Sequence, residues 1–166
     1  MASILGVETL QHTNGTTAAT IDSSGHVDLG ANSVVQIITN TYDTELSLTT
    51  SYQDTGLDAT ITPKYSNSKI LVQWCINYGT SDSSAGCHIQ ENIYRDSTRL
   101  DSATDGLRVL TSYHTGRIYH TTSWVDTPAT TSAITYKIQA KEGSGDTGTA
   151  HEDGNPSIMI LTEIRQ

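Results

Sequence analysis

The sequence has no phenylalanine, few charged residues and no cluster of basic side chains. Charged residues make up 16% of the 166 positions. This argues against a helix-rich protein, because exposed helix faces are usually covered with Glu, Lys and Arg. The net charge is −9, and the nine Lys and Arg residues occur singly. Binding to nucleic acid or to an anionic membrane surface is therefore not expected, since neither phosphates nor anionic lipids would meet enough positive charge.

Long apolar runs are also missing. The first seven residues, MASILGV, have neither the basic start nor the apolar stretch of a cleaved secretory signal. No apolar run approaches the length of a membrane span, so no membrane insertion is expected. The sequence thus predicts a chain made and folded in a cytoplasm. In that compartment Cys75 and Cys87 are expected to be free thiols, although pairing between them stays open.

Signatures of catalysis are absent as well. There is no Gly-x-Ser-x-Gly elbow, no catalytic Cys/His signature and no phosphate-binding glycine loop. On one extended strand His114 and His120 would lie about 20 Å apart, too far to share a metal unless a hairpin or a symmetry axis brings histidines together. Residues 146–153 are the best candidate for a calcium loop, but they lack EF-hand spacing. The prediction is no enzyme, no cofactor and no metal; a carbohydrate-active or cupin-like enzyme is the alternative from another class.

The residues that are present favour β-structure. Thr and Ser fill the polar positions, and β-branched Thr suits a pleated strand. About eight short strands with turn signals between them predict an all-β, antiparallel sandwich of the jelly-roll type, with an immunoglobulin-like sandwich as the alternative. We expect strands at 33–39 (continuing polar to 44), 45–50, 59–62, 69–78, 87–94, 107–125 (with a bulge or tight turn at Gly116), 133–140 and 156–164.

A polar leader precedes the strands. Residues 6–32 are almost all small, polar or glycine, with isolated aliphatic residues that include Leu10, Ile21, Val27 and Leu29. Alone, such a segment cannot bury enough apolar surface to offset the entropy of ordering. It is either a disordered tail or a segment that orders against other copies of itself or a partner. The predicted organisation is an extended N-terminal segment at 1–32 and a jelly-roll head at 33–166.

Three polar segments, 79–86, 101–106 and 142–155, are predicted to be loops long enough to vary function on a rigid scaffold. The candidate receptor-facing residues within these loops are Asp82, Ser84, Asp105, Asp146 and His151. Eight Tyr and two Trp replace Phe. Tyrosine offers apolar area and a hydroxyl group, which suits subunit contacts and surfaces that bind saccharides.

The leader LQHTNGTTAATIDSSGHVDLG resembles the N-terminal segment of many structural proteins of marine and cyanobacterial tailed phages. Five further pieces resemble the β-rich C-terminal domains of the same proteins, so the resemblance covers nearly the whole chain; these pieces are SKILV at 68–72, IYRD at 93–96, DTP at 126–128, TYK at 135–137 and IMILTEI at 158–164. Arg95-Asp96 departs from the arginine-glycine that often stands there, and the chain is short for a complete tail fibre.

The resemblance implies a virion component that assembles in the host cytoplasm. It points to a homotrimeric fibre or fibre tip whose leader attaches to other phage virion proteins of the tail or capsid, and whose head binds a host surface glycan. The trimer axis would gather Leu10, Ile21, Val27 and Leu29 from three copies, because symmetric closure supplies the burial that one leader lacks. The alternative is a capsid decoration protein that stabilises the phage head.

Overall fold

The computed structural model describes residues 6–21, 23, 25, 27–81, 87–104, 106–112, 116–143 and 147–166. In these residues the chain forms β-strands and a single 3-10 turn, η1. The elements are β1 (Thr9–Gln11), β2 (Thr17–Ile21), β3 (Val27–Asp28), β4 (Val34–Tyr42), β5 (Leu46–Ser47), β6 (Gln53–Ile61), β7 (Lys69–Ser81), β8 (Cys87–Arg95), β9 (Thr98–Arg99), β10 (Leu107–Ser112), β11 (Gly116–Asp126), β12 (Ile134–Glu142), β13 (Thr147–Ala150), η1 (Glu152–Gly154) and β14 (Ser157–Ile164).

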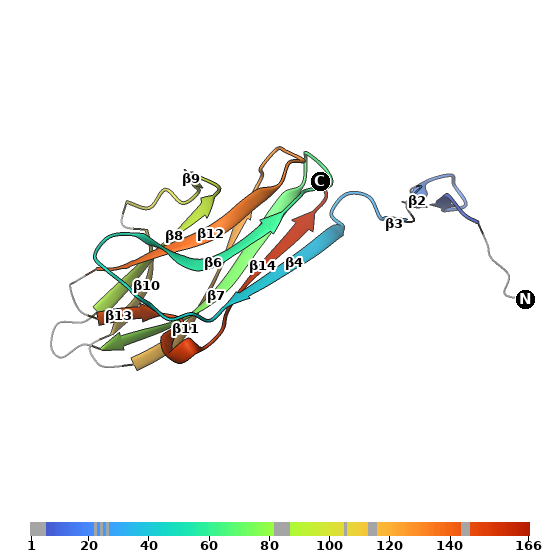
Figure 1. The fold of residues 1–166 in the computed structure, drawn as a ribbon. Coiled ribbons are helices and arrows are strands. Elements are labelled where there is room, and N and C mark those ends of the chain that lie inside the picture. Colours follow the sequence, from blue (N-terminus) through green and yellow to red (C-terminus); the bar gives the residue numbers. More distant parts are fainter. Residues whose placement is uncertain are drawn as a thin grey trace, which may run out of the picture.

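Eight of the strands build two packed sheets, as Figure 1 shows. Sheet I has the order β4-β14-β7-β11. On the same side of β7 as β14, β13 pairs with the end of β7, and β5 pairs with β13. Sheet II has the order β6-β12-β8-β10, with β9 beside the end of β8. Numbered along the chain, these eight strands run 1-8-3-6 in one sheet and 2-7-4-5 in the other, and all pairs are antiparallel. This is jelly-roll topology, and it confirms the predicted fold class.

The core lies between the two sheets and follows the strand period of two. Residues of β12 and β14 are alternately buried and half-buried along their full length. The longest strand, β7, contributes alternate residues from Ile70 to Tyr78, with Trp74 at the centre. Burying a large apolar side chain contributes roughly 1.5–3 kcal/mol, so these alternating positions determine which face of each strand turns inward.

Four predicted segments differ from the structure. The strand expected at 45–50 is reduced to the two residues of β5 (Leu46–Ser47). The single strand expected at 107–125 is two strands, β10 and β11, which lie in opposite sheets, and β11 pairs with β7 from Gly116 onward without a bulge. The segment 142–155, which was expected to be a loop, contains β13 and η1. The strand was missed because its glycine and threonine residues are also typical of loops. The strand expected at 59–62 begins at Gln53, because Thr55 and Leu57 alternate inward while Asp and Gly occupy the outer positions.

The leader forms a small sheet of its own, β1-β2-β3, which Figure 1 shows apart from the sandwich. Ala19 is its buried hydrophobic residue. The chain enters the sandwich beside the C-terminus: Asn32 N donates to Arg165 O (2.7 Å), and Arg165 N donates to Ser33 O (3.0 Å). The leader is thus fastened at its base, while its sheet extends away from the head.

Candidate functional site

The strand order brings four connections to one end of the sandwich, which we call the loop end. β7 ends and β8 begins there, β10 ends and β11 begins there, and β12 ends and β13 begins there. The fourth connection runs from β4 through β5 to β6. Two of the predicted receptor-facing loops, 79–86 and 142–155, therefore share this end, whereas 101–106 leaves β9 at the opposite end and follows the edge of β8.

Four of the candidate residues, Asp82, Ser84, Asp105 and Asp146, lie outside the described residues, so their role stays a prediction. The fifth, His151, is fully buried, and the prediction that it faces a receptor is wrong. Its Nε2 lies 2.9 Å from the carbonyl oxygen of Thr55 and its Nδ1 lies 2.7 Å from Ser157 Oγ. The ring also packs edge-on against Tyr42, with centroids 5.0 Å apart.

His151 lies between β13 and β14, and its two ring nitrogens stabilise the chain at this point. The carbonyl of Thr55 only accepts, so Nε2 carries the proton and Nδ1 accepts from the Ser157 hydroxyl. Burial lowers the pKa of His151, which keeps the ring in this neutral form. The residue therefore has a structural role, because its hydrogen bonds link β14 to β6.

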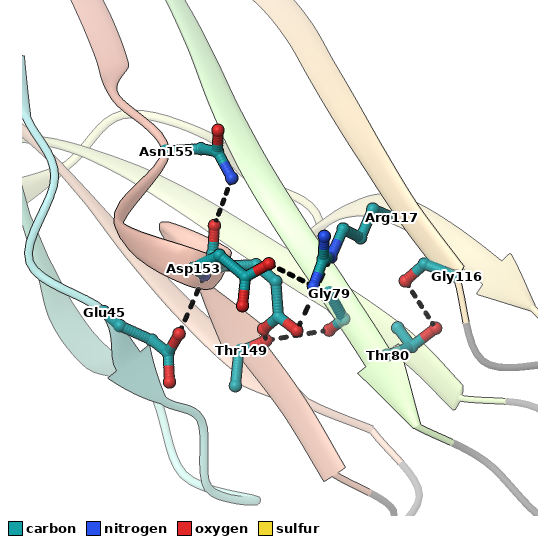
Figure 2. Close-up of polar contacts among 9 residues, drawn as sticks. Glu45, Gly79, Thr80, Gly116, Arg117, Thr149, Asp153 and Asn155 are labelled. Carbon is teal, nitrogen blue, oxygen red and sulfur yellow. Dashed lines mark hydrogen bonds and ion pairs between the residues drawn. The ribbon is translucent and has the colours of Figure 1, made fainter.

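A hollow of about 460 Å³ opens at the loop end, between β11, β13 and η1. Figure 2 shows the polar groups that converge on it. Its lining residues are Glu45, Thr80, Gly116, Arg117, Thr147, Thr149, Glu152 and Asp153. The turn η1 places two of the three carboxylates, and β11 supplies the guanidinium.

Arg117 is the cation of this hollow. It forms an ion pair with Asp153, and its Nε lies 3.8 Å from Glu152 Oε1. The side chains of Arg117 and Asp153 are more than half exposed, so this ion pair contributes at most about 1 kcal/mol. Both ends of the pair therefore remain accessible to a ligand.

The remaining contacts position the carboxylates. Glu45 Oε2 accepts from the backbone N–H of Asp153 (2.8 Å), and Glu152 contacts the hydroxyl of Thr149. A Cβ on Gly79 would overlap the Glu152 carboxyl group, so the glycine leaves the room that this side chain occupies. Acceptors and donors side by side in an open hollow suit the hydroxyl groups of a sugar.

A buried polar cluster was not predicted from the sequence. Glu91 is fully buried; its Oε2 accepts from Trp74 Nε1 (2.9 Å) and its Oε1 from the hydroxyl of Tyr78 (2.6 Å). Burial and then the neighbouring carboxylate raise the pKa of Tyr78, so its hydroxyl stays protonated and donates. The available signal was that Glu91 lies between Ile89 and Ile93, on the apolar side of β8.

His120 turns inward from β11 toward this cluster, with Nδ1 3.4 Å from Glu91 Oε2. His114 lies outside the described residues. Within the described part of the chain, no group of three or more His, Cys, Asp or Glu residues is placed to hold a metal ion. Cys75 carries a free thiol on the outer side of sheet I.

The leader keeps its aliphatic side chains outside any core of the single chain. Leu10, Val27 and Leu29 are 51%, 57% and 63% exposed, and Ile21 is half-buried. The three strands therefore present apolar surface that one copy of the chain does not cover. The predicted trimer axis through these residues stays a prediction.

Neither a family model nor a curated protein matches this sequence. Among solved structures, the T13 particle of infectious bursal disease virus matches with 15% identity and a TM-score of 0.44, over 84% of this chain and 38% of that chain. The VP2 subviral particle of the same virus matches with 14% identity and a TM-score of 0.36, over 98% and 42%. This chain thus spans less than half the length of either protein. Both TM-scores are below 0.5, so the jelly-roll assignment rests on the strand order of the chain itself.

In the described residues, the single helical turn is far too short to cross a lipid bilayer. Two features of the described surface stand out at this point, the loop-end hollow and the exposed apolar side chains of the leader.

Proposed function

We propose that this protein is a structural, non-enzymatic subunit of a tailed-bacteriophage particle. In this proposal it is a small homotrimeric fibre or fibre tip, attached to the virion by its leader and presenting a jelly-roll head. The observation that carries the proposal is the leader itself: a three-stranded sheet with one buried hydrophobic residue, Ala19, and three largely exposed aliphatic ones.

Physical reasoning favours a partner for the leader. A small isolated sheet without a covered apolar face is marginally stable in water. Covering an aliphatic side chain completely contributes roughly 1.5–3 kcal/mol, and Leu10, Val27 and Leu29 are all available. Three copies around one axis, or a groove on another virion protein, would supply that cover. The resemblance to phage structural proteins, carried by the leader sequence, points to the virion as the setting.

The head would supply host contact. Its loop end combines the connections most free to vary with a hollow that holds Arg117, Glu152 and Asp153. Charged and hydroxyl side chains on a rigid sandwich are suited to bind a polar glycan. Because Arg117→Ala removes the guanidinium group of the hollow without altering the core, it should weaken binding to host cells. Thr60→Ala on the outer side of sheet II serves as the control.

The second candidate is a capsid decoration protein, in which the leader lies across the shell. The extension of the leader away from the head favours this alternative equally, since an extended segment can reach a neighbouring shell subunit. Cryo-electron microscopy of the particle separates the two, because density at the tail supports the fibre and density on the capsid surface supports decoration.

The attachment claim is tested with point variants of the full chain. Val27→Asp and Leu29→Asp place a charge where we expect an apolar contact, and Thr13→Asp adds the same charge at an exposed turn of the same leader. We expect particles assembled with the first two to lose this protein and particles with the third to keep it. Equal incorporation of all three would contradict attachment through the leader, and hydrolysis of a host polysaccharide would contradict the non-enzymatic role.

A further inference from the structure

The outer side of sheet I carries an unusual surface. Pairing among β4, β14, β7 and β11 aligns three rows of outward-facing side chains across four strands. We call this surface the uncharged face. Its rows are Thr41–Ile158–Cys75–Thr121, Thr39–Ile160–Gln73–Ser123 and Ile37–Thr162–Leu71–Val125. None of the twelve positions holds Asp, Glu, Lys, Arg or His.

Half of the twelve positions of the uncharged face are apolar, and the others are Thr, Ser or Gln. Ile37 is 58% exposed and Val125 is 57% exposed, at the two edges of one row. Ile158, Ile160 and Leu71 are half-buried between them. Such exposed positions on a strand would ordinarily be occupied by charged or strongly polar residues. Apolar side chains across four adjacent strands therefore indicate a surface that another protein covers.

The outer side of sheet II provides the comparison within the same molecule. There the outward positions of β6 and β12 include Asp54, Asp58, Lys137 and Lys141. Lys137 Nζ lies 2.9 Å from Asp54 Oδ2, and Gln139 donates to the same carboxyl group. Sheet II thus has the solvated outer face expected of an antiparallel sandwich. The two sheets of one head differ in the property that distinguishes an interface core, the depletion of charge.

We propose that the uncharged face is the surface through which copies of this chain pack against one another. The inference deepens the proposed function, because it rests on the homo-oligomer named there and assigns its contact in the head. The net charge of the chain indicates that the molecule covering this face is a second copy of it. Each copy carries a net charge of −9, so copies repel unless they meet where carboxylates are absent. The uncharged face meets that condition, and its ends have the polar rim of an interface, with Lys69 at one end and Arg117 at the other.

The face accounts for most of the area of a stable contact. With strands about 4.8 Å apart and alternate residues about 6.8 Å apart, the three rows cover roughly 390 Å², and the adjoining Val34, Ile164, Lys69 and Tyr119 bring this to roughly 520 Å². Stable interfaces bury about 600–1,000 Å² on each partner, so the contact would extend beyond the face at its ends. The flanking rows add Val34 and Tyr119, which are also among the large exposed hydrophobic residues.

The position of the face also connects it to the leader. Val34 continues the rows at the end where the chain leaves the leader, two residues after Asn32. β4 therefore carries the uncharged face directly from the base of the leader, as Figure 1 shows for the course of the chain. Copies that pack through this face would bring their leaders to the same side of the assembly, where the exposed Val27 and Leu29 could cover one another.

The test uses three variants of the full chain, each adding one carboxylate at an exposed strand threonine. Thr39→Glu on β4 and Thr121→Glu on β11 lie on the uncharged face, and Thr60→Glu on β6 lies on the outer side of sheet II. Sedimentation over a range of concentrations gives the dissociation constant of the oligomer. Since each carboxylate on the face would be buried without a partner, we expect that constant to rise at least about 100-fold. The control variant should stay within about threefold of the parent protein.

A second measurement needs no substitution. Cys75 lies within the face, so its alkylation should slow as the protein concentration is raised through the dissociation constant, with the modified peptide identified by mass spectrometry. An oligomeric parent whose two face variants remain oligomeric, or whose Cys75 reacts at one rate throughout, would overturn the assigned face and leave the trimer standing. A parent protein that is monomeric throughout would overturn both.

Discussion

Replacing Glu91 with leucine is expected to destabilise the head, because it leaves two buried donors without an acceptor. The carboxylate is fully buried between the sheets and accepts from Trp74 Nε1 (2.9 Å) and from the Tyr78 hydroxyl (2.6 Å). Both donors come from β7, and the acceptor comes from β8 of the facing sheet. The cluster therefore joins the two layers of the sandwich through their centre.

The magnitude follows from competing contributions. Each orphaned buried donor costs about 1–3 kcal/mol. Leucine offsets part of this, because it buries apolar surface worth roughly 2 kcal/mol and removes a carboxylate that was costly to desolvate. Since the two orphaned donors together cost about 4 kcal/mol and leucine returns about half of that, we expect a net loss of about 2 kcal/mol in the free energy of unfolding. Glu91→Gln, which keeps one oxygen acceptor, should lose about half as much.

Urea unfolding followed by tryptophan fluorescence measures these differences, since Trp74 itself reports on the cluster. The control is Tyr78→Phe, which removes one donor. Its cost should be large in the parent protein and close to zero in the Glu91→Leu variant, giving a coupling energy of at least about 1 kcal/mol. A Glu91→Leu variant that unfolds at the same or a higher urea concentration than the parent would refute the reasoning.

Two further predictions concern other buried groups. Glu163→Gln should cost about 2–3 kcal/mol in urea unfolding, because the carboxylate accepts from Ser68 Oγ (2.7 Å) and from the N–H of Lys64 (2.9 Å) at charge-assisted strength; an unchanged midpoint would contradict this. Burial holds the pKa of His151 below 6.5 in the folded protein, so the unfolded chain takes up the proton first as the pH falls. The contribution of neutral His151 is then complete above about pH 6.5 and is lost below it, by up to about 1.4 kcal/mol per pH unit. Thermal unfolding at pH 7.5 and 5.5 checks this: the fall in unfolding temperature between the two pH values should be smaller for His151→Asn than for the parent protein. Asparagine is chosen because it tolerates the left-handed backbone at this position (φ 56°). Equal falls in the two proteins would exclude His151 as the cause.

Strand alternation predicted the fold class because burial on one side of a strand leaves a period of two in the sequence. The pattern was strongest in β7 and β12, where inward positions are apolar without exception from Ile70 to Tyr78 and from Ile134 to Ala140. It failed between β10 and β11, since both strands contain β-branched residues and periodicity does not tell to which sheet each strand belongs. It failed again at β13, whose four residues, TGTA, resemble a loop.

The buried polar residues could not be located from sequence for a different reason. Glu91 and His151 are satisfied by partners 6 to 96 positions away, and the assembled sheets bring these groups together. A histidine in a glycine- and aspartate-rich segment is typical of a solvated loop, so the sequence placed His151 on the surface.

The uncharged face depends in the same way on register. Its rows join residues from positions 37 to 162, through three strand pairings. In the sequence, each strand by itself shows an ordinary mixture of apolar residues with Thr, Ser or Gln. The absence of charge becomes visible only when the four strands are aligned.

The mass of the full chain in solution tests the central claim most directly, because both the leader and the uncharged face are assigned to contacts between copies. Sedimentation equilibrium should give three times the 17.9 kDa mass of the chain, with dissociation promoted by Thr121→Glu and not by Thr60→Glu. A mass of 17.9 kDa that persists as the concentration is raised would contradict the account.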